Sequence, residues 1–407
     1  MKIRTPVILL SCAAFCLSSI AADVLADQLS VEERALQITK KYLLTDTHID
    51  MPYRVHHGWV DVSNSAIDGQ FDYPRAVEGG LNLPFMSIYT PSEMEEEGGS
   101  YELANQLIDS VEAIAARAPD KFMLVYSVAD AEKAMQSGRI GLAMGMENGS
   151  PIDHKLENVR FFADRGISYI TLAHGLSNQI SDSSYDDNKQ WGGLSPFGKD
   201  VVREMNHVGI MVDISHVSDE AFWQTLEITR VPVIASHSSA RRFTPDFERN
   251  MSDEMIIALA RNGGVIQINW GSGFLTAAAN AYSTKFWELR ETWLKENGFD
   301  EDGPEADKFK EEYYKEHAYP FATLAETVGH FDHVIKLVGV DYVGIGSDFD
   351  GVGDSLPVGL KDVSEYPNLV AEFLRRGYSE SDIAKILGGN LLRVWSQVEA
   401  YAQTNKG

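Results

Sequence analysis

The chain has 407 residues, a formal net charge of −25 and a hydrophobic content of 44%. This length allows one large domain or two ordinary ones, and the apolar content is ample for a packed core. Such an acidic balance repels phosphate backbones and anionic lipid surfaces, so we expect no nucleic-acid partner.

The first 26 residues have the features of a secretory signal peptide. Lys2 and Arg4 give a basic start, residues 6–20 are nearly all apolar or small, and small residues precede Ala26. We therefore expect cleavage after Ala26 and export, to the periplasm if the cell is Gram-negative. A retained membrane anchor and lipidation at Cys12 are the disfavoured alternatives, because the apolar stretch is short. Both cysteines, Cys12 and Cys16, lie in this segment, so His and carboxylates would hold any metal in the mature chain.

Eight short apolar runs follow and alternate with amphipathic stretches. They are rich in Val, Ile, Leu and Met without strict polar alternation, which is typical of parallel strands covered on both faces. The runs are 43–49, 81–89, 140–146, 168–173, 210–215, 231–236, 264–269 and 342–347.

Helix-like segments separate several of these runs. Residues 101–116 carry apolar side chains at near-helical spacing, and residues 196–208 begin with Pro196 and stop before Gly209. Ser218 and Ser252 could cap helices at 219–229 and 253–261. This alternation predicts an α/β fold, a (β/α)8 barrel of the TIM type that forms a single domain over residues 27–407.

A doubly wound open sheet is the alternative fold. The barrel is favoured because ionisable residues follow many strands rather than gathering at one crevice. One region, around residues 277–320, interrupts the alternation with a long, charged and helix-prone insertion. Such an insertion is expected to be a lid, an oligomer contact or a solvated surface helix.

Ionisable residues stand at the ends of several runs, where a barrel would bring them to the C-terminal face of its strands. A buried charge must be paired or coordinated, so we interpret His48, Asp50, Glu147, His216 and His237 as metal ligands. In an extended strand His48 and Asp50 would point to the same side and reach one ion. The carboxylate of Glu147 could bridge two ions.

Two metal ions would make a water reactive at neutral pH, because metal binding lowers its pKa from ~15.7 to ~7. Asp348 ends the last run and is a candidate proton carrier, and Asp350 lies on the same side by the period of two. A turn role is the alternative for Asp350. His174 could donate to a developing oxyanion or make a structural hydrogen bond. Arg249 could bind a substrate carboxylate or form a surface ion pair.

Together these residues resemble the membrane (renal) dipeptidase family, binuclear zinc peptidases of the amidohydrolase-like barrels. The resemblance runs over nearly all of the mature chain and rests on seven motifs in the family's order. They are Asp-Thr-His-Ile-Asp-Met-Pro at 46–52, Met-Glu-Asn-Gly at 146–149, Leu-Ala-His-Gly at 172–175, Asp-Ile-Ser-His at 213–216, Ala-Ser-His-Ser-Ser-Ala-Arg at 235–241, Arg-Asn at 249–250 and Gly-Ile-Gly-Ser-Asp-Phe-Asp-Gly at 344–351.

The resemblance implies two Zn²⁺ ions per chain. His48 and Asp50 would hold one, His216 and His237 the other, and Glu147 would bridge them.

The resemblance also assigns the remaining residues. Asp348 would shuttle the proton, His174 would contact the oxyanion of the scissile carbonyl, and Arg249 would bind the substrate's C-terminal carboxylate, with Arg241 and Arg242 as competitors. The implied reaction is hydrolysis of dipeptides, including L,D-dipeptides, by a water that bridges the two zinc ions. Relatives commonly form homodimers. The chain ends on a polar sequence, so we expect no stable membrane anchor after signal cleavage.

Two other readings stay open. The first is another metal-dependent barrel amidohydrolase, such as an N-acyl amino-acid deacylase or a lactonase, although many of these bridge their metals with a carboxylated Lys where this chain has Glu147. The second is a non-catalytic exported binding protein on a degenerate barrel. The complete ligand set together with Asp348 disfavours it.

Overall fold

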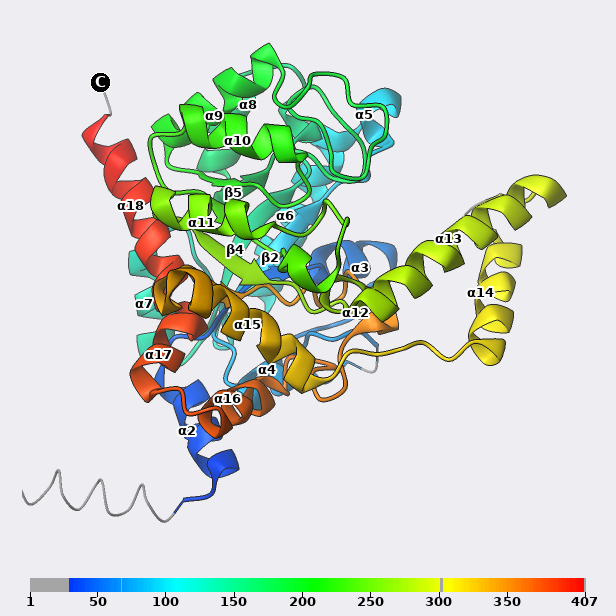
Figure 1. Ribbon diagram of the computed structural model, residues 1–407. Helices are drawn as coiled ribbons and strands as arrows, with labels where there is room; N and C mark the ends of the chain where they lie inside the picture. Colours follow the sequence, from blue (N-terminus) through cyan, green and yellow to red (C-terminus); the bar gives the residue numbers. More distant parts are fainter. Residues whose placement is uncertain (1–28, 67, 301–302, 406–407) are drawn as a thin grey trace, which may run out of the picture.

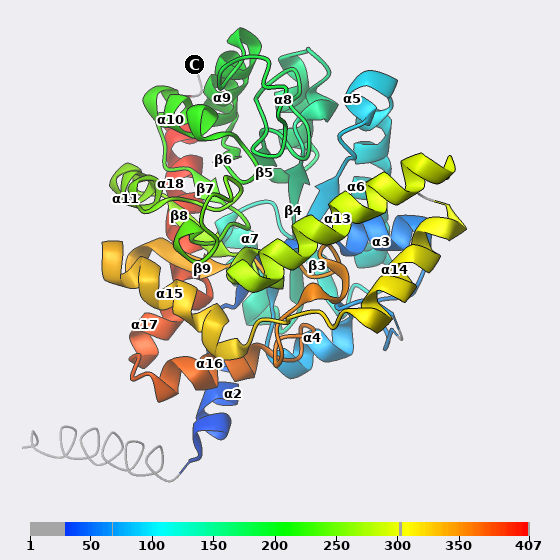
Figure 2. The same cartoon turned by 45° about the vertical axis from the view of Figure 1, so that its right-hand side comes forward.

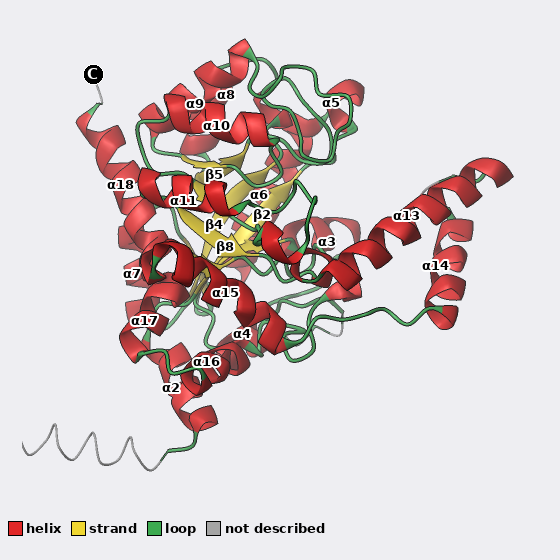
Figure 3. Cartoon of the chain, in the orientation of Figure 1, coloured by secondary structure: helices red, strands yellow, loops and turns green. Residues whose placement is uncertain are grey.

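The computed structural model describes residues 29–66, 68–300 and 303–405, so the expected signal peptide lies outside the described residues. The described chain forms a nearly closed barrel of parallel strands surrounded by helices, which confirms the predicted (β/α)8 fold (Figures 1 and 3). In order around the barrel the strands are β1 (Thr45–Ile49), β2 (Leu83–Tyr89), β4 (Ile140–Glu147), β5 (Ile167–Thr171), β6 (Met211–Asp213), β7 (Ile234–Ala235), β8 (Val265–Ile268) and β9 (Val343–Ile345).

The barrel closes just beyond the ends of its first and last strands. Ile49 and Phe349 form a parallel bridge, and the amide of Asp50 donates to the carbonyl of Phe349 at 2.8 Å. The amide of Asp348 donates to the carbonyl of His48 at 3.1 Å. Closure therefore brings the backbone that carries His48 and Asp50 directly beside the backbone that carries Asp348.

Each of the eight apolar runs overlaps one barrel strand, with β4 and β5 each extending one residue beyond its run, and one further strand was not predicted. This strand, β3 (Phe122–Leu124), pairs with the start of β4, where Phe122 lies opposite Ile140. Three residues are too short a run to show a period in the sequence.

Helices cover the outside of the barrel (Figure 3). Their bounds are α2 (Val31–Lys41), α3 (Met51–His57), α4 (Tyr73–Gly79), α5 (Met94–Glu97), α6 (Ser100–Arg117), α7 (Val128–Ser137), α8 (Glu157–Asp164), α9 (Pro196–Val208), α10 (Asp219–Ile228), α11 (Asp253–Asn262), α12 (Ser272–Leu275), α13 (Ala277–Asn297), α14 (Pro304–Glu316), α15 (Leu324–Val338), α16 (Tyr366–Arg375), α17 (Glu380–Ala384) and α18 (Asn390–Thr404). Within the described ranges, none of them combines the length and the apolar character that crossing a bilayer requires.

The sequence predicted the starts of several helices from their caps. The hydroxyl of Ser218 accepts from the amide of Ala221 at 3.2 Å, and that of Ser252 accepts from the amide of Met255 at 3.3 Å. Helix α9 spans the predicted residues, and the left-handed backbone of Gly209 ends it.

The segment 277–320 contains α13 and α14, which lie side by side and project away from the barrel (Figures 1 and 2). The pair is held together by aromatic contacts such as that between Phe286 and Tyr313, whose ring centroids are 5.3 Å apart. We call this pair the helical arm. Its base adjoins α12, which follows β8 at the C-terminal end of the barrel.

Candidate metal centre

The predicted metal ligands meet at the C-terminal ends of the strands. His48 lies on β1, Glu147 ends β4, and Asp50 is the residue before α3. His216 and His237 lie in the turns after β6 and β7. All five are buried, so their side chains must be satisfied by one another or by a bound group.

The carboxylate of Glu147 occupies the centre of this cluster. Its Oε1 lies 3.2 Å from Nε2 of His216 and 3.2 Å from Nε2 of His237. Its Oε2 lies 3.2 Å from Nε2 of His48. The two oxygens of one carboxylate therefore face two different sets of imidazoles.

On the Oε2 side, two more carboxylates complete the cluster. Nε2 of His48 is 3.4 Å from Oδ2 of Asp50. The side chains of His48, Asp50 and Asp348 offer ligand atoms that all lie within 4.8 Å of one another.

Hydrogen bonds at the far side of the His237 ring fix its tautomer. Its Nδ1 lies 2.7 Å from the hydroxyl of Ser236, which itself donates to Oδ2 of Asp213 at 2.6 Å. Since that hydroxyl has one proton and gives it to Asp213, it must accept from Nδ1–H of His237. The lone pair of His237 is thus left on Nε2, the atom that faces the cluster.

His48 is oriented in the same way from another strand. Its Nδ1 lies 2.9 Å from the hydroxyl of Tyr169, which donates to the carbonyl of Thr47 at 2.9 Å. Nδ1 of His48 therefore carries a proton, and its Nε2 presents a lone pair to Glu147.

Lone pairs that face carboxylate oxygens at 3.2 Å repel one another unless a cation lies between them. The Nε2 atoms of His216 and His237 are also 2.8 Å apart. Among the described residues, Nε2 of His48 and Oδ1 of Asp50 are buried without a hydrogen-bond partner. This donor set of imidazole nitrogens and carboxylate oxygens fits zinc or a similar divalent ion.

The electrostatics of His216 and His237 agree with this reading. Burial holds the pKa values of His216 and His237 well below their usual range, so both rings are neutral and able to ligate at pH 7.

Burial opposes ionisation of Glu147, but the neighbouring His48 and His174 rings still keep its pKa well below the ordinary value. Burial opposes a charge on His48, but the neighbouring Tyr169, Glu147 and Asp50 raise its pKa well above the usual range, because a proton on Nε2 can neutralise these oxygens in the place of a cation.

The hydrogen bond between Tyr169 and His48 requires a glycine at position 145, because the Tyr169 ring packs directly against the backbone there. A Cβ added at Gly145 on β4 would lie 2.0 Å from Cζ of Tyr169. We expect Gly145→Ala to destabilise the fold by about 1–3 kcal/mol through overpacking. Displacement of Tyr169 should also weaken metal binding by about 10–100-fold.

The matched control for that variant is Gly329→Ala in α15, where an added Cβ meets nothing within 4 Å. That change should stabilise the protein by about 0.5–1 kcal/mol, because alanine favours the helix. Thermal melting and zinc titration measure both effects. Two alanine variants that melt alike would contradict the predicted clash.

Asp348 and Asp350 were predicted to lie on the same side of a strand, but their side chains contact different residues. Nδ2 of Asn269 donates to Oδ2 of Asp348 at 2.7 Å. Asp350 instead forms an ion pair with Nε of Arg54 at 3.1 Å and accepts from the amide of Gln70 at 2.6 Å. The period-two rule fails because β9 ends at Ile345 and both aspartates have left-handed φ angles of 64° and 66°.

Burial raises the pKa of Asp348 to about 7. A carboxyl group with such a pKa can both take up and release a proton near neutral pH. With Oδ2 engaged by Asn269, Oδ1 is the oxygen available for that exchange.

His174 carries its proton on the opposite ring nitrogen from His48 and His237. The hydroxyl of Ser92 accepts from the amides of Gly175 and Leu176, so its own proton points to Nδ1 of His174, 3.4 Å away. Nε2 of His174 therefore bears hydrogen, and it lies 3.6 Å from Oε1 of Glu147. This geometry makes the ring a hydrogen-bond donor directed into the centre.

Arg249 is buried beside the centre rather than at the surface. Its two terminal nitrogens donate to the hydroxyl of Ser238 at 2.7 Å and to the carbonyl of His237 at 2.8 Å. Its Nε is buried and has no partner among the described residues. Arg241 is already paired with Asp219 at 2.6 Å and 2.7 Å, and Arg242 is exposed. Arg249 is thus the arginine of this segment that retains an unused donor beside the centre.

Sequence reasoning missed the residues that orient the ligands. These are Ser92, Tyr169, Asp213, Ser236 and Asn269. Asn269 ends the seventh apolar run, so the strand-end rule could have found it. Asp213 and Ser236 lie inside the motifs at 213–216 and 235–241, but no local sequence pattern indicates that they contact each other.

A (β/α)8 barrel with buried histidines and carboxylates at the C-terminal ends of its strands defines a metal-dependent barrel hydrolase. Residues 32–407 match the model of the membrane dipeptidase family, peptidase family M19. The chain belongs to this family, whose members are zinc-dependent dipeptidases.

Individual dipeptidases are also similar to this chain in sequence. Dipeptidase tcpJ of Claviceps purpurea is 33% identical over 83% of this chain and 72% of its own length. Dipeptidase 3 of Mus musculus is 29% identical over 93% of this chain and 69% of its own length.

Solved structures share the fold. The structure described as the probable dipeptidase PvdM from Pseudomonas aeruginosa superposes with a TM-score of 0.76 and 28% identity, over 91% of this chain and 99% of that one. A metallopeptidase from Rhodobacter sphaeroides, solved with a phosphinate mimic of L-Ala-D-Ala, superposes with a TM-score of 0.71 and 21% identity, over 88% of this chain and 99% of that one. The latter likeness concerns the fold alone.

Proposed function

We propose that the chain is an exported dipeptidase that uses two zinc ions to hydrolyse the peptide bond of dipeptides, including L,D-dipeptides. The observation that carries the two-ion proposal is the position of Glu147, with His48 against Oε2 and with His216 and His237 against Oε1. One carboxylate between two sets of lone pairs is the arrangement that two bridged cations require.

In this proposal His48 and Asp50 hold one ion, His216 and His237 hold the other, and Glu147 serves both. When bound, the ions supply a water of lowered pKa and polarise the scissile carbonyl.

The chain's own residues position the substrate and move the proton. Oδ1 of Asp348 takes the proton of the attacking water and passes it to the leaving amine. Nε2–H of His174 donates to the oxygen of the scissile carbonyl as negative charge develops there. The unused Nε of Arg249 lies beside the centre to bind a substrate carboxylate.

The proposal is tested by assaying a panel of L,L- and L,D-dipeptides with zinc-loaded protein, after chelation, and after zinc is restored. We expect chelation to abolish hydrolysis and zinc to recover it. N-acyl amino acids and lactones in the same panel represent the rival barrel hydrolases. Faster turnover of either rival class than of any dipeptide would refute the dipeptidase assignment.

Export, a periplasmic location and homodimer assembly stay predictions from the sequence and the family resemblance. Mass spectrometry of the secreted protein would show whether residues 1–26 are removed, and light scattering would give the number of copies per particle.

The binding of the substrate carboxylate by Arg249, which we call the carboxylate clamp, gives a separate prediction. We expect Arg249→Lys to raise KM for dipeptides with a free carboxylate by about 10–100-fold, since a charge-assisted hydrogen bond contributes about 1.5–3 kcal/mol and lysine cannot reproduce the planar fork. Dipeptide amides, which lack the carboxylate, should show little change in KM.

Arg242→Lys, at an exposed position nearby, is the matched control and should leave both substrates unaffected. Zinc content must be measured in parallel, because Arg249 also donates to the carbonyl of His237. An equal effect on free and amidated dipeptides would contradict the clamp.

A further inference from the structure

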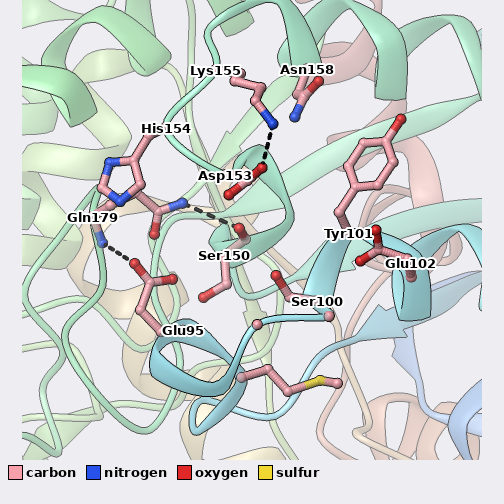
Figure 4. Close-up of a pocket in the computed structure, with 13 residues that line it drawn as sticks. Glu95, Ser100, Tyr101, Glu102, Ser150, Asp153, His154, Lys155, Asn158 and Gln179 are labelled. Carbon is pink, nitrogen blue, oxygen red and sulfur yellow. Dashed lines mark hydrogen bonds and ion pairs between the residues drawn. The ribbon is translucent and has the colours of Figure 1, made fainter.

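Among the cavities that open on the described part of the molecule, two lie near the C-terminal ends of the barrel strands, and they differ in chemistry. One, of about 540 Å³, lies between α5, α6 and the turn after β4, and its walls are polar (Figure 4). There Glu95 accepts from the amide of Gln179 at 2.9 Å, and Lys155 pairs with Asp153 at 2.7 Å. None of the described metal-centre residues lines it.

The second cavity, of about 640 Å³, lies between the barrel mouth and the helical arm. We call it the aromatic cavity, because most of its large lining side chains are rings. Tyr185, Phe247 and Phe274 line its barrel side. Phe286, Trp287 and Tyr314 line its arm side.

The aromatic cavity adjoins the metal centre through its wall, although none of the described metal-centre side chains lines it directly. Tyr185, on its barrel side, has its ring centroid 5.9 Å from that of His216. Gly351 also lines the cavity, and a Cβ added there would lie 2.2 Å from Oδ1 of Asp348 and 2.2 Å from Oδ2 of Asp50. The wall of the cavity is therefore in direct contact with two carboxylates of the metal centre, those of Asp348 and Asp50.

The cavity also adjoins the proposed carboxylate clamp. The guanidinium of Arg249 lies 5.4 Å from the ring centroid of Phe274, and the rings of Phe274 and Phe247 are 5.8 Å apart. A residue whose carboxylate is held by Arg249 would thus have the aromatic wall beside its Cα. Lys310 and Asp354 are the charged groups among the described residues that line the cavity, and neither belongs to this wall.

We propose that the aromatic cavity binds the side chain of the substrate's C-terminal residue and that the enzyme favours dipeptides in which this side chain is large and apolar or aromatic. Ring-on-ring contact and loss of apolar surface from water supply the preference. The proposal rests on the proposed dipeptidase function and names the substrate class of that same site.

The test compares Gly-Gly, Gly-Phe and Phe-Gly on the zinc-loaded full chain. We expect kcat/KM for Gly-Phe to exceed that for Gly-Gly by about tenfold or more, the scale on which an apolar pocket discriminates. Phe-Gly carries the same ring on the other residue and should gain far less.

A variant on the arm links the preference to the cavity. Trp287 is 58% exposed, so its replacement should leave the barrel folded. Trp287→Ala should lower kcat/KM for Gly-Phe severalfold while Gly-Gly is unchanged. Leu289→Ala, also exposed on α13 but outside the cavity lining, is the matched control and should change neither.

The outcomes separate this proposal from the function on which it rests. Hydrolysis of Gly-Gly and Gly-Phe with equal kcat/KM, or a preference that follows the N-terminal ring in Phe-Gly, would overturn the cavity assignment and leave a dipeptidase. An equal loss on both substrates in Trp287→Ala would also overturn it. Failure to hydrolyse any dipeptide would instead refute the proposed function.

Discussion

Substitution of Glu147 by Gln is expected to lower the zinc content of the purified protein and to reduce kcat/KM by about a thousandfold or more. Glu147 faces His48 through one oxygen and His216 and His237 through the other. The amide has nearly the same shape but lacks the charge, and its NH₂ group cannot ligate a cation. Loss of several kcal/mol of charge stabilisation corresponds to this factor, since each ~1.4 kcal/mol is tenfold.

Elemental analysis gives the zinc content per chain, and circular dichroism shows whether the variant is folded. His207→Ala, at a partly exposed histidine on α9, is the matched control and should retain both metal and activity. A folded Glu147→Gln protein that keeps two zinc ions and full turnover would contradict the central position of this carboxylate.

His216→Ala distinguishes two ions from one. Because His48 and Asp50 face the other oxygen of Glu147, we expect this variant to lose one ion, to keep the other and to lose nearly all activity. Retention of two ions would refute His216 as a ligand.

The barrel could be predicted from the sequence because each buried parallel strand leaves an apolar run. The order of the strands around the barrel then follows the order of the runs, except that the short β3 pairs beside β4. The same logic located the ligands, since the ends of parallel strands meet at one face. His48 and Glu147 lie where that rule puts them, at the last but one residue of β1 and at the last residue of β4.

The rule fails where the backbone leaves the strand. Asp348 and Asp350 are two residues apart, yet their left-handed φ angles turn one toward the metal centre and the other toward Arg54. The hydrogen bonds that orient the ligands could not be predicted from the sequence either, because they join distant parts of the chain. Tyr169 and His48 are 121 residues apart, and no local pattern pairs them.

The direction of the helical arm could not be predicted for a similar reason. Its composition indicated helices, but the placement of Trp287 and Tyr314 beside the barrel mouth depends on how α12 leaves β8. From the sequence alone, the segment around 277–320 was expected to be a lid, an oligomer contact or a surface helix. In the structure, the arm supplies one wall of a cavity next to the metal centre.

The last prediction separates proton transfer from metal binding. Asp348→Asn is expected to keep the zinc content of the unmodified protein and to slow turnover by about 10²–10⁴-fold, the usual contribution of a positioned acid–base group. Asparagine preserves the shape that packs against Asn269 but cannot take up a proton. The effect should fall on kcat, because the proton moves after the substrate is bound.

Asp350→Asn is the matched control, since it removes the other carboxylate of the same turn after β9 by the same change of side chain. Asp350 pairs with Arg54 at 3.1 Å and its side chain is 1% exposed, so its loss should lower the melting temperature by leaving the half-buried Arg54 without its ion-pair partner. The folded fraction should turn over at the unmodified rate, because Asp350 faces away from the metal ligands. If Asp348→Asn retained full kcat, or if the two variants lost kcat equally, Asp348 would not be the group that carries the proton.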